Sequence, residues 1–561
     1  MNHKITRREF LRYAGMGAGA IALASCGAPQ GAPPTPTVAA TPKVPAGPEP
    51  LTLPIVKQPL TLTYWVDLNP NAAASMKTYG EMACYQELEK RTGVHIEFQH
   101  PPVGQAQEQF SLTMASQKYP DIIEHGWGGE PGGGSTPPGG PAKYLKDGVI
   151  IRLNELIDKY APNFKKLLTD HPDWRKQIVA DEGDIYGFPF IRGDPYLQTY
   201  QGPILRGDWL EKLGLQVPTT LDEWHTVLKA LKEKDPNGNG KADEWPFNSF
   251  RGSGPAHALN GFSNHAFVGA WGIGWEFYQE KGAVKYGPLQ PEFKEFLKVM
   301  AQWFKEGLID PDFVAMDRKL LDAKVTGGQL GSLVGNAGAN LGVYMDALAS
   351  KEPKFKLVSA PYPTLKKGDK PVLGQYDFAY AGVAAAITTA NKHVAETVKW
   401  LDYAYSPEGH LLFNFGVEGV SYKMEGGYPK YTAEILKNPQ FPVARAMPRY
   451  FRSSMNGPFV QDRRYLEQYY GYPEQTEALK LWSAPSNEMQ IPRTTPAQEE
   501  SKRFGTIMTD VGARRDEAVI KIITGAQPVE TWDQVVQQFK QMGIEEAVKV
   551  QQAALDRYNK R

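Results

Sequence analysis

A β-strand is predicted by the stretch Leu60-Thr61-Leu62-Thr63-Tyr64-Trp65-Val66, which is dense in apolar, aromatic and β-branched side chains. Residues 74–91 follow with helical spacing of their apolar side chains, and Val94–Phe98 alternate as a second strand. The same order repeats, because residues 104–117 have helical spacing and residues 121–124 form a third strand candidate. Strands separated by helix-length segments favour parallel βαβ units, so this stretch predicts an α/β fold.

The N-terminal 25 residues have the three parts of a lipoprotein signal peptide. Basic residues between Lys4 and Arg12 precede a small apolar run that is shorter than the about 20 residues of a membrane-spanning helix. The run Leu23-Ala24-Ser25-Cys26 has the form of a lipoprotein cleavage site, where the chain is cut before the cysteine and the thiol receives lipid. The basic part, Thr6–Arg12, resembles a twin-arginine export signal. We therefore expect the protein on the extracellular face of the cell membrane, anchored by the lipid on Cys26.

The composition predicts a large folded body that does not bind nucleic acid. The chain has 561 residues, 41% of them hydrophobic, which is enough for a large core and more than one domain. It carries 62 basic and 62 acidic residues, and loss of residues 1–25 would remove four basic residues and one acidic residue. The slightly acidic balance that results leaves no nucleic-acid footprint. Cys26 carries the lipid, so Cys84, the other of the two cysteines, has no disulfide partner.

Two segments of low complexity interrupt the ordered sequence. Residues 26–57 include Pro33-Pro34-Thr35-Pro36 and predict an extended linker between the lipid and the body. Such a tract rises by roughly 3 Å per residue where it is polyproline-like. Residues 128–140 are rich in glycine and predict a surface loop. No Lys-Ser or Lys-Thr pair follows these glycines, which excludes a phosphate-binding loop.

A series of short motifs runs through the body of the chain. They are Glu182–Pro189, Ile204–Leu215, Pro218–Trp224, Phe304–Phe313, Gly416–Tyr422, Trp532-Asp533, Met542–Ile544 and Asp556–Tyr558. Within the third motif, Thr220 and Glu223 have capping-box spacing, which predicts that a helix starts there. The order of these motifs resembles the extracellular solute-binding proteins of sugar ABC importers. Within that family it is similar to the large lipoprotein branch that includes the alginate-binding proteins.

This resemblance implies a two-lobed α/β fold of the periplasmic-binding-protein type (type II), with a hinge between the lobes and a ligand cleft at their interface. The expected layout is discontinuous. Residues 58–190 begin the first lobe, 191–365 form most of the second, 366–415 return to the first, and 416–561 complete the second as its C-terminal helical part. The implied function is that a monomer captures a sugar or oligosaccharide and delivers it to the membrane permease subunits of an ABC importer.

A calcium-binding loop is predicted at residues 235–244, which read Asp-Pro-Asn-Gly-Asn-Gly-Lys-Ala-Asp-Glu. Oxygen side chains at alternating positions, with glycine at the sixth, match the first half of an EF-hand loop and can converge on one cation. A solvated Asn/Gly turn is the alternative. Pro246 occupies loop position twelve, so Glu244 has to supply the missing carboxylate, as it does in the alginate-binding relatives. The predicted ligands of a structural Ca²⁺ are Asp235, Asn237, Asn239, the Lys241 carbonyl, Asp243 and Glu244.

Contacts with a carbohydrate are expected from aromatic and polar side chains, because sugar rings have apolar C–H faces and many hydroxyls. Trp127 lies just past the third strand candidate, at the sheet edge where α/β proteins bind ligands. Each aromatic residue alone is more often a core residue, and Arg206 has the alternative role of anchoring a strand. The candidate ligand-binding residues are Trp127, Tyr196, Arg206, Trp271, Trp275, Tyr376 and Phe378.

Two other functions stay open at this point: an extracellular polysaccharide-degrading hydrolase or lyase, and a peptide-binding lipoprotein. A glycosidase needs two carboxylates across a cleft, and a chain with 62 acidic residues contains such pairs by chance. The sequence has no Gly-x-Ser-x-Gly elbow, no His-Glu-x-x-His motif and no Cys/His cluster with metal spacing. We therefore expect a binding protein and not an enzyme.

Overall fold

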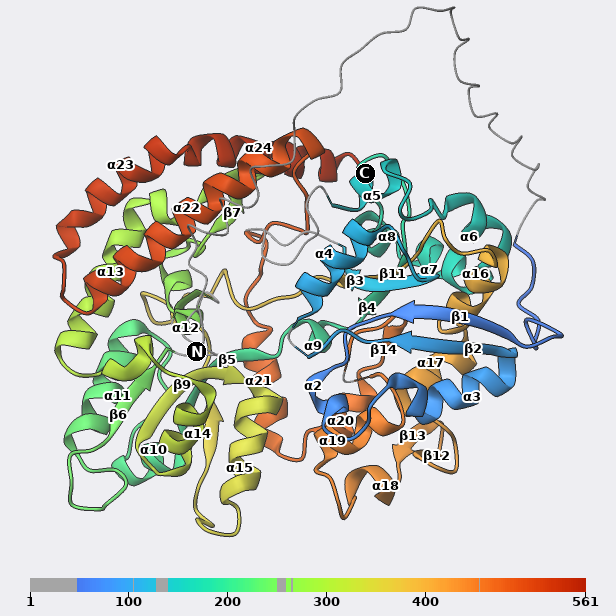
Figure 1. Cartoon of the computed structure of the whole chain (residues 1–561). Helices are drawn as coiled ribbons and strands as arrows, with labels where there is room; N and C mark the ends of the chain where they lie inside the picture. Colours follow the sequence, from blue (N-terminus) through green and yellow to red (C-terminus); the bar gives the residue numbers. More distant parts are fainter. Residues whose placement is uncertain (1–47, 104, 128–139, 250–258, 264–265, 454) are drawn as a thin grey trace, which may run out of the picture. The chain divides into compact units, whose positions relative to one another are not determined.

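The strand predicted at residues 60–66 is confirmed as β1 (Leu60–Trp65), part of a six-stranded sheet in the computed structural model (Figure 1). The structure describes residues 48–103, 105–127, 140–249, 259–263, 266–453 and 455–561, which lie within the compact unit Pro45–Arg561. In sheet order the strands are β14 (Val460–Gln461), β4 (Phe188–Arg192), β11 (Tyr380–Ile387), β3 (Ile122–Gly126), β1 and β2 (Val94–Gln99).

The pairing of these strands confirms the predicted parallel βαβ units. Strand β1 runs parallel to β2, with Leu60 opposite Val94, and parallel to β3. Strand β11 is antiparallel to β3 and to β4, so β4 has the same direction as β1. The carboxyl ends of β1, β3 and β4 therefore meet at one edge of the sheet.

The helix predicted over residues 74–91 is divided into two shorter elements, the 3₁₀ turn η1 (Tyr79–Glu81) and α3 (Ala83–Thr92). The separate short helix α2 (Pro70–Ala73) ends before residue 74. Thr78 and Met82 have extended backbone angles, and the Thr78 side chain caps the turn by accepting from the Gly80 amide. A threonine side chain that bonds to the local backbone competes with helix continuation. The helix predicted over 104–117 is confirmed as α4 (Ala106–Ser116).

The six-stranded sheet has its own buried core, which includes Trp127, Phe188 and Trp400. These side chains are at most 2% exposed. Burial of each such side chain stabilises the fold by about 1.5–3 kcal/mol. The further helices of this part are α5 (Gly140–Lys146), α6 (Asn154–Tyr160), α7 (Pro162–Asp170), α8 (Pro172–Ile178), α16 (Val394–Tyr403) and α17 (Pro407–Phe415).

A second sheet has four strands in the order β10 (Leu357–Ser359), β5 (Gln201–Arg206), β9 (Leu330–Asn336) and β6 (Trp245–Asn248). Strand β6 is parallel to β9, whereas β5 is antiparallel to β9 and to β10. Helix α11 (Leu221–Glu233) begins where the capping box predicts, because the Thr220 hydroxyl accepts from the Glu223 amide. The other helices here are α10 (Gly207–Leu213), α12 (Asn260–Ser263), α13 (Pro291–Lys305), α14 (Arg318–Thr326), α15 (Val343–Leu348) and α21 (Pro473–Trp482).

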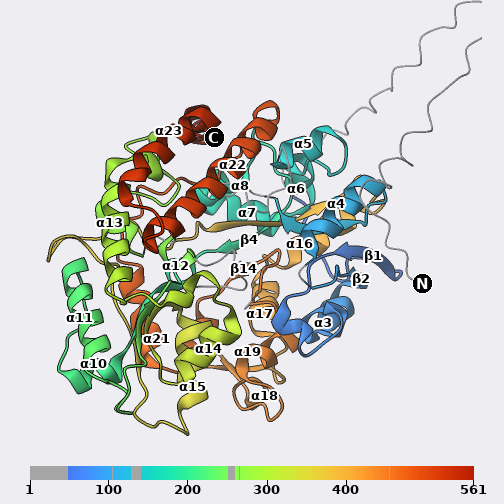
Figure 2. The same ribbon diagram turned by 60° about the vertical axis from the view of Figure 1, so that its left-hand side comes forward.

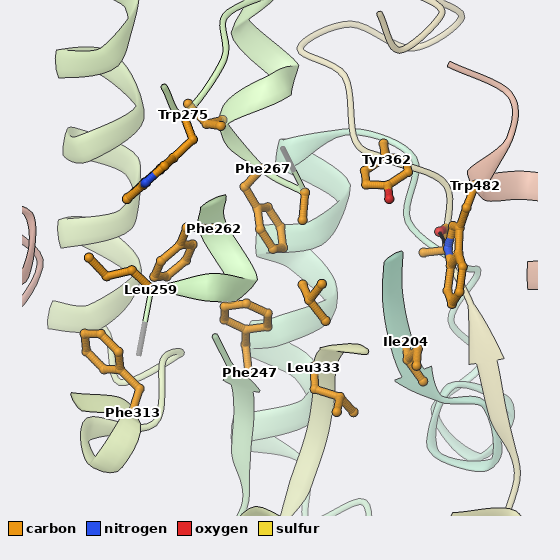
Figure 3. Close-up of a cluster of buried hydrophobic side chains, with 14 of the residues drawn as sticks. Ile204, Phe247, Leu259, Phe262, Phe267, Trp275, Phe313, Leu333, Tyr362 and Trp482 are labelled. Atoms are coloured by element: carbon orange, nitrogen blue, oxygen red, sulfur yellow. Dashed lines mark hydrogen bonds between the residues drawn. The ribbon is translucent and has the colours of Figure 1, made fainter. Parts of the chain in front are cut away.

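The core of the second sheet is built largely from aromatic rings. Figure 3 shows Phe247 of β6 among Phe262 and Phe267, with ring centroids 6.0 and 5.1 Å from that of Phe247. Trp482 of α21 packs near Ile204 of β5 in the same cluster. Near the C-terminus, helix α22 (Gln498–Ile523) packs against α13 and α23 (Trp532–Met542) (Figure 2) and against α24 (Ile544–Asn559) (Figure 1).

Short elements complete the described chain. They are α9 (Pro195–Gln198), the hairpins β7 (Phe277–Glu280)–β8 (Ala283–Tyr286) and β12 (Tyr422–Glu425)–β13 (Tyr428–Tyr431), α18 (Ala433–Leu436), α19 (Val443–Ala446) and α20 (Arg464–Tyr469). Turns of 3₁₀ type are η3 (Val268–Trp271), η4 (Gly287–Leu289), η5 (Pro311–Val314), η7 (Met447–Arg449) and η8 (Val529–Thr531), and η6 (Ala337–Gly342) is a π-helical turn. None of the helices in the described ranges is long and apolar enough to cross a membrane.

Two sheets with separate cores agree with the predicted two-lobed α/β fold, and the chain passes between the sheets more than once. It leaves the first sheet after β4 to enter the second with β5, and it returns from β10 to β11. One part of the expected layout differs. Strand β14 lies within the segment 416–561, yet Val460 pairs with Ile191 of β4, so this strand belongs to the first sheet. The other lobe boundaries stay a prediction.

Candidate functional site

Three strands lead to polar residues that meet in one cavity. Asn69 follows β1, Arg192 ends β4, and Asn336 ends β9 of the second sheet. All three line a cavity of about 290 Å³. In open α/β sheets, ligands bind outside the carboxyl ends of the strands, so the position of this cavity is that of a ligand site.

We call this cavity the tyrosine pocket, after the ring-bearing side chains that form much of its wall. Its lining combines aromatic rings and side-chain amides from both sheets and from the segment after β14. The aromatic members are Phe190, Tyr196, Tyr200, Tyr465, Tyr469 and Tyr470. The polar members are Asn69, Arg192, Asn336, Asn456 and Gln461, and the remaining ones are Leu197, Gly338, Ala339, Met455 and Leu466. Aromatic faces with a few amides can stack on a ring and hydrogen-bond its substituents.

Arg192 is held rigidly in the wall of the tyrosine pocket. Its guanidinium forms an ion pair with Asp377, and the two side chains are only 19% and 20% exposed. The guanidinium also lies over the rings of Phe190 and Tyr200, 5.7 and 5.3 Å from their centroids. An arginine with its charge paired and its plane stacked loses little further entropy when it binds a ligand.

Two buried polar atoms of the pocket lack a hydrogen-bond partner. They are Nε of Arg192, which is a donor, and Oδ1 of Asn336, which is an acceptor. A buried polar group without a partner costs about 1–3 kcal/mol, so such atoms are uncommon unless a ligand or water completes them. The pocket therefore offers one donor and one acceptor to a bound molecule.

The tyrosines on α20 keep their hydroxyl protons. Tyr465 and Tyr469 are four residues apart and so lie on one face of the helix. Burial raises the pKa of Tyr465, of Tyr469 and of Tyr470 above the ordinary tyrosine value. At neutral pH these side chains are uncharged, which lets the hydroxyls act as both donors and acceptors.

A buried ion pair supports the segment that carries Asn456. Arg452 is 1% exposed and donates through Nη2 to Glu124 Oε1 of β3 at 2.7 Å. The same guanidinium donates through Nε to the Asn456 carbonyl at 2.9 Å and through Nη1 to the Tyr85 hydroxyl. The Glu124 carboxylate is satisfied on its other oxygen by the Tyr64 hydroxyl at 2.8 Å. This network fixes Arg452 and Asn456 against the first sheet.

Of the seven predicted ligand-binding residues, the structure brings Tyr196 to the tyrosine pocket. Tyr376 and Phe378 are outside its lining; they are the chain neighbours of Asp377, and their rings pack edge to face at 5.4 Å. Trp271 packs on Phe296 and lines a separate open groove of about 650 Å³ between α11 and α13.

The other three predicted residues have structural contacts in the cores. Trp127 is fully buried, and its Nε1 donates to the Ala384 carbonyl at 3.1 Å. Arg206 forms a two-point ion pair with Asp208 and lies over the ring of Trp209 at 4.3 Å, which is the strand-anchoring alternative. Trp275 is 4% exposed and packs on Phe293 and Phe296.

One sequence feature could have predicted part of the tyrosine pocket, although the sequence analysis did not single it out. Residues 465–472 read Tyr-Leu-Glu-Gln-Tyr-Tyr-Gly-Tyr, the densest run of tyrosines in the chain. The helical spacing of Tyr465 and Tyr469 could have pointed to an aromatic face. Arg192 and Asn336 carried no such signal, because each is a single polar residue at the end of an apolar strand.

A larger cavity, of about 760 Å³, has a different character, and we call it the charged cavity. Its ionic side chains largely satisfy one another. Asp181 accepts from Arg557 and Arg561, and Arg152 pairs with Asp184. The two tyrosines in its wall, Tyr186 and Tyr380, are buried and share a hydrogen bond of 2.7 Å. We assign the ligand site to the tyrosine pocket and not to the larger cavity, because the tyrosine pocket lies where strands of both sheets end and is lined by six aromatic rings.

The predicted calcium loop has the compact turn that its glycines suggest. Gly238 and Gly240 have φ angles of 76° and 74°, a region that only glycine enters readily. The Asp235 carboxylate accepts from the amides of Gly238, Asn239 and Gly240 at 2.8, 3.1 and 2.9 Å. These backbone hydrogen bonds lower the pKa of Asp235, so the loop holds a charged carboxylate at neutral pH.

The carboxylate and amide side chains of this loop contact one another. The amide nitrogens of Asn237 and Asn239 donate to Asp243, and the Asn237 backbone amide donates to Glu244 Oε1. Glu244 is 4% exposed, and its Oε2 has no partner. Burial raises the pKa of Glu244, which a neighbouring cation would reverse.

The donor set of the loop therefore fits Ca²⁺. In the described ranges, no cluster of three or more His, Cys, Asp or Glu side chains is placed to hold a metal. The loop mixes carboxylates with amide and carbonyl oxygens, which is the set that calcium accepts. Lys241 contributes its amide to Asn239 Oδ1, which leaves its carbonyl as the predicted ligand. Cys26, the predicted lipid site, lies outside the described residues.

Comparisons with known proteins identify the family to which this sequence is similar. A family model described as bacterial extracellular solute-binding protein matches residues 69–410. The fructooligosaccharide ABC transporter substrate-binding protein FusA of Streptococcus pneumoniae is 27% identical over 521 residues, which cover 88% of this chain and 90% of FusA.

Two solved structures are also similar to this chain. The alginate-binding protein AlgQ2 without calcium ion is similar with a TM-score of 0.69 and 27% identity, over 90% of this chain and 99% of AlgQ2. An EF-hand mutant of S. pneumoniae FusA in complex with fructo-nystose is similar with a TM-score of 0.68 and 25% identity, over 89% and 99% of the two chains.

Proposed function

The chain belongs to the family of bacterial extracellular solute-binding proteins, and on this basis we propose that it captures an oligosaccharide and delivers it to an ABC importer. FusA, which carries this role for fructooligosaccharides, is similar over nearly its whole length. The proposed partners are the carbohydrate ligand and the membrane permease subunits of the importer. Capture leaves the ligand chemically unchanged, so the proposed role is not enzymatic.

The observation that carries this proposal is the tyrosine pocket. Its wall combines aromatic faces with amides, and it retains an unpartnered donor at Arg192 Nε and an unpartnered acceptor at Asn336 Oδ1. A sugar ring offers apolar C–H faces to the tyrosines and hydroxyls that both donate and accept. Arg192 ends a strand of the first sheet and Asn336 ends a strand of the second, so one ligand would contact both. Binding would then favour whichever arrangement of the lobes completes these contacts.

We further propose that the protein is held at the extracellular face of the membrane by lipid on Cys26. The signal-like segment 1–25 and the proline-rich stretch that follows Cys26 support this placement. A tether of this kind keeps the binding protein near its transporter while the linker lets it move.

A structural Ca²⁺ in the loop 235–244 is the third part of the proposal. Its support is the mixture of carboxylate and amide groups in one tight loop, the partnerless Oε2 of Glu244, and the similarity to the structures of AlgQ2 without calcium ion and of the FusA EF-hand mutant. Asp235, Asn237, Asn239, Asp243 and Glu244 would hold the ion together with the Lys241 carbonyl. The bound ion would lend its positive charge to a loop that carries three carboxylates.

A ligand screen with the purified protein tests the proposed function. Neutral and acidic oligosaccharides and short peptides would be compared by thermal unfolding, because a ligand that binds only the native state raises the midpoint. We expect at least one oligosaccharide to raise it and to be recovered intact by chromatography. Failure of every oligosaccharide, a shift with peptides alone, or new reducing ends or unsaturated products would overturn the proposal.

A pair of variants ties the result to the tyrosine pocket. Asn336→Ala removes an unpartnered acceptor and should weaken oligosaccharide binding by about tenfold, since one hydrogen bond of about 1.4 kcal/mol is lost. Asn559→Ala changes an exposed asparagine at the end of α24 and should bind like the unmodified protein. Titration calorimetry measures both affinities. Equal affinity of the Asn336→Ala variant would place the site elsewhere.

A further inference from the structure

We infer that the tyrosine pocket selects uncharged saccharides over acidic ones such as oligouronates, because the Arg192 guanidinium in its described lining is already neutralised by Asp377 and its unpartnered atoms match hydroxyl groups. The inference rests on the proposed function, since it names the class of saccharide for that same site. It concerns charge, which neither the fold nor the overall composition of the chain decides.

The charge balance of the pocket wall is the first observation. Among the described residues that line the tyrosine pocket, Arg192 is the one with a charged side chain, and the rest are amides, tyrosines and apolar groups. The pKa values of Tyr465, Tyr469 and Tyr470 are raised by burial, so they add no charge at neutral pH. Asp377 supplies the counter-charge of Arg192 from behind the wall.

The ion pair with Asp377 is the second observation. A ligand carboxylate beside Arg192 would place two negative charges around one guanidinium in a half-buried setting. Arg192 cannot turn away from Asp377 without leaving the rings of Phe190 and Tyr200, over which it is stacked. An acidic saccharide would therefore lose its hydration and gain no net opposite charge. A neutral saccharide has no such loss.

The hydrogen-bond requirements of the pocket are the third observation. Asn336 Oδ1 needs a donor and Arg192 Nε needs an acceptor. A hydroxyl group provides either one, whereas a carboxylate only accepts. A carboxylate could accept from Arg192 Nε, but it could not donate to Asn336 Oδ1, which would stay without a hydrogen. Neighbouring hydroxyls of a neutral sugar satisfy both atoms at once.

Other charged groups close to the pocket are also paired. Arg463 lies over the ring of Tyr196 at 5.0 Å and pairs with Glu467 on the next turn of α20. Asp462 forms ion pairs with Arg464 and His410. In the part of the chain that the structure describes, the surroundings of the pocket thus offer an acidic ligand no cation that lacks a carboxylate partner of its own.

Calorimetry with two ligand series tests the inference on the full chain. Neutral fructo- and gluco-oligosaccharides would be compared with oligogalacturonates of the same chain length. We expect the best neutral ligand to bind at least tenfold more tightly than any oligogalacturonate, and its affinity to change less than twofold between low and high salt. Oligogalacturonates that bind as tightly or more tightly would overturn the inference while supporting the proposed function. If neither series binds, the proposed function itself fails.

A charge-releasing variant gives an independent test. Asp377→Asn leaves the Arg192 charge without its partner and should raise oligogalacturonate affinity at least fivefold, with a salt dependence that the unmodified protein lacks. Glu425→Gln removes the carboxylate of an exposed ion pair with Lys430 on the β12–β13 hairpin and should leave both affinities unchanged. Circular dichroism confirms folding of each variant, and the salt dependence of the unmodified protein decides the question if Asp377→Asn does not fold. Unchanged preference in a folded Asp377→Asn variant would overturn the inference.

Discussion

At the scale of single residues, Gly202 on β5 is required by the packing of Trp482. Trp482 is fully buried and donates from its indole Nε1 to the Ala360 carbonyl at 3.0 Å. A Cβ atom on Gly202 would lie 2.4 Å from that indole nitrogen. We predict that Gly202→Ala lowers the free energy of unfolding by about 1–3 kcal/mol, because the ring must shift.

Denaturant unfolding followed by fluorescence measures this change, with Gly505→Ala as the matched control. Gly505 lies in the exposed face of α22, where an added Cβ meets nothing within 4 Å. Alanine is the better helix former, so this control should gain up to about 1 kcal/mol. A stability loss of similar size in both variants would contradict the steric explanation.

Asp402 gives the stability a defined pH dependence. Burial raises the pKa of Asp402 to about 6, even though its carboxylate accepts from the Phe164 amide and from Asn163. The native state therefore holds this proton more tightly than the unfolded state, whose aspartate pKa is about 3.9. The contribution of Asp402 to stability is fully present below about pH 4 and is lost as the pH rises through 6.

The variant Asp402→Asn should remove that part of the pH dependence. We expect the difference in unfolding free energy between the variant and the unmodified protein to change by about 1–3 kcal/mol between pH 4 and pH 7, in favour of the variant at the higher pH. Chemical unfolding at several pH values measures it. A difference that stays constant over this range would show that Asp402 does not titrate there.

The sequence could predict only a small part of the candidate site. Tyr196 was predicted because aromatic faces suit the apolar C–H faces of sugar rings. Arg192, Asn336 and Tyr465 were missed because the tertiary fold brings them together from segments far apart in the chain. Trp127 and Trp275 satisfy the same sequence criteria as Tyr196, yet their rings are buried in the cores. Composition and spacing do not distinguish these two outcomes.

At the scale of secondary-structure elements, the 235–244 loop links the proposed metal to two strands. Asn237 donates to the Gly328 carbonyl just before β9, and the Trp245 amide at the start of β6 donates to the Gln329 carbonyl. Loss of Ca²⁺ should therefore loosen the amino ends of both strands. We predict that a chelator lowers the thermal midpoint and that added Ca²⁺ restores it.

The variant Glu244→Gln tests which residue completes this site. It removes the carboxylate whose Oε2 has no partner and should weaken Ca²⁺ binding at least tenfold by calorimetry. Glu545→Gln, a change in the first turn of α24, is the control and should bind Ca²⁺ normally. If the unmodified protein shows neither binding heat nor a chelator effect, the loop is a solvated turn.

The strands that the sequence predicted correctly have apolar residues at their buried positions. Strands β1 and β2 have burial patterns that follow their apolar residues, so their periodicity reports the fold directly. The division of the helix predicted over 74–91 depends on one side-chain cap at Thr78, which apolar spacing does not report. Strand β14 has two residues and exists only because β4 lies beside it. Elements that depend on a partner distant in sequence have no local pattern.

At the scale of the whole molecule, the C-terminal helix is fastened to the segment that precedes β4. Asp181 accepts from Arg557 Nε at 2.7 Å and from Arg561 Nη2 at 2.6 Å, and it is 18% exposed. Removal of this charge would take from two partly buried guanidinium groups the carboxylate that each contacts most closely. We predict that Asp181→Asn lowers the free energy of unfolding by about 1–3 kcal/mol.

Asp533→Asn is the control for this prediction. Asp533 also pairs with a basic residue, Lys294, but it is 70% exposed, and exposed pairs contribute about 0–1 kcal/mol. Thermal and chemical unfolding of both variants should show a clear loss for Asp181→Asn and little for Asp533→Asn. Equal effects would mean that the contact at the C-terminus is ordinary surface pairing.

Strand β14 comes 400 residues after β1 in the sequence, and this has a consequence for biosynthesis. The sheet starts with residue 60 and takes its last strand from residues 460–461, so a nascent chain cannot complete it until most of the protein has been synthesised. Contacts between such distant segments slow folding and leave partly built sheet edges exposed in the meantime. A newly made chain would thus depend on protection by chaperones for most of its translation. An export route that accepts cargo only after folding, as the predicted twin-arginine signal implies, would give this chain the time to finish inside the cell.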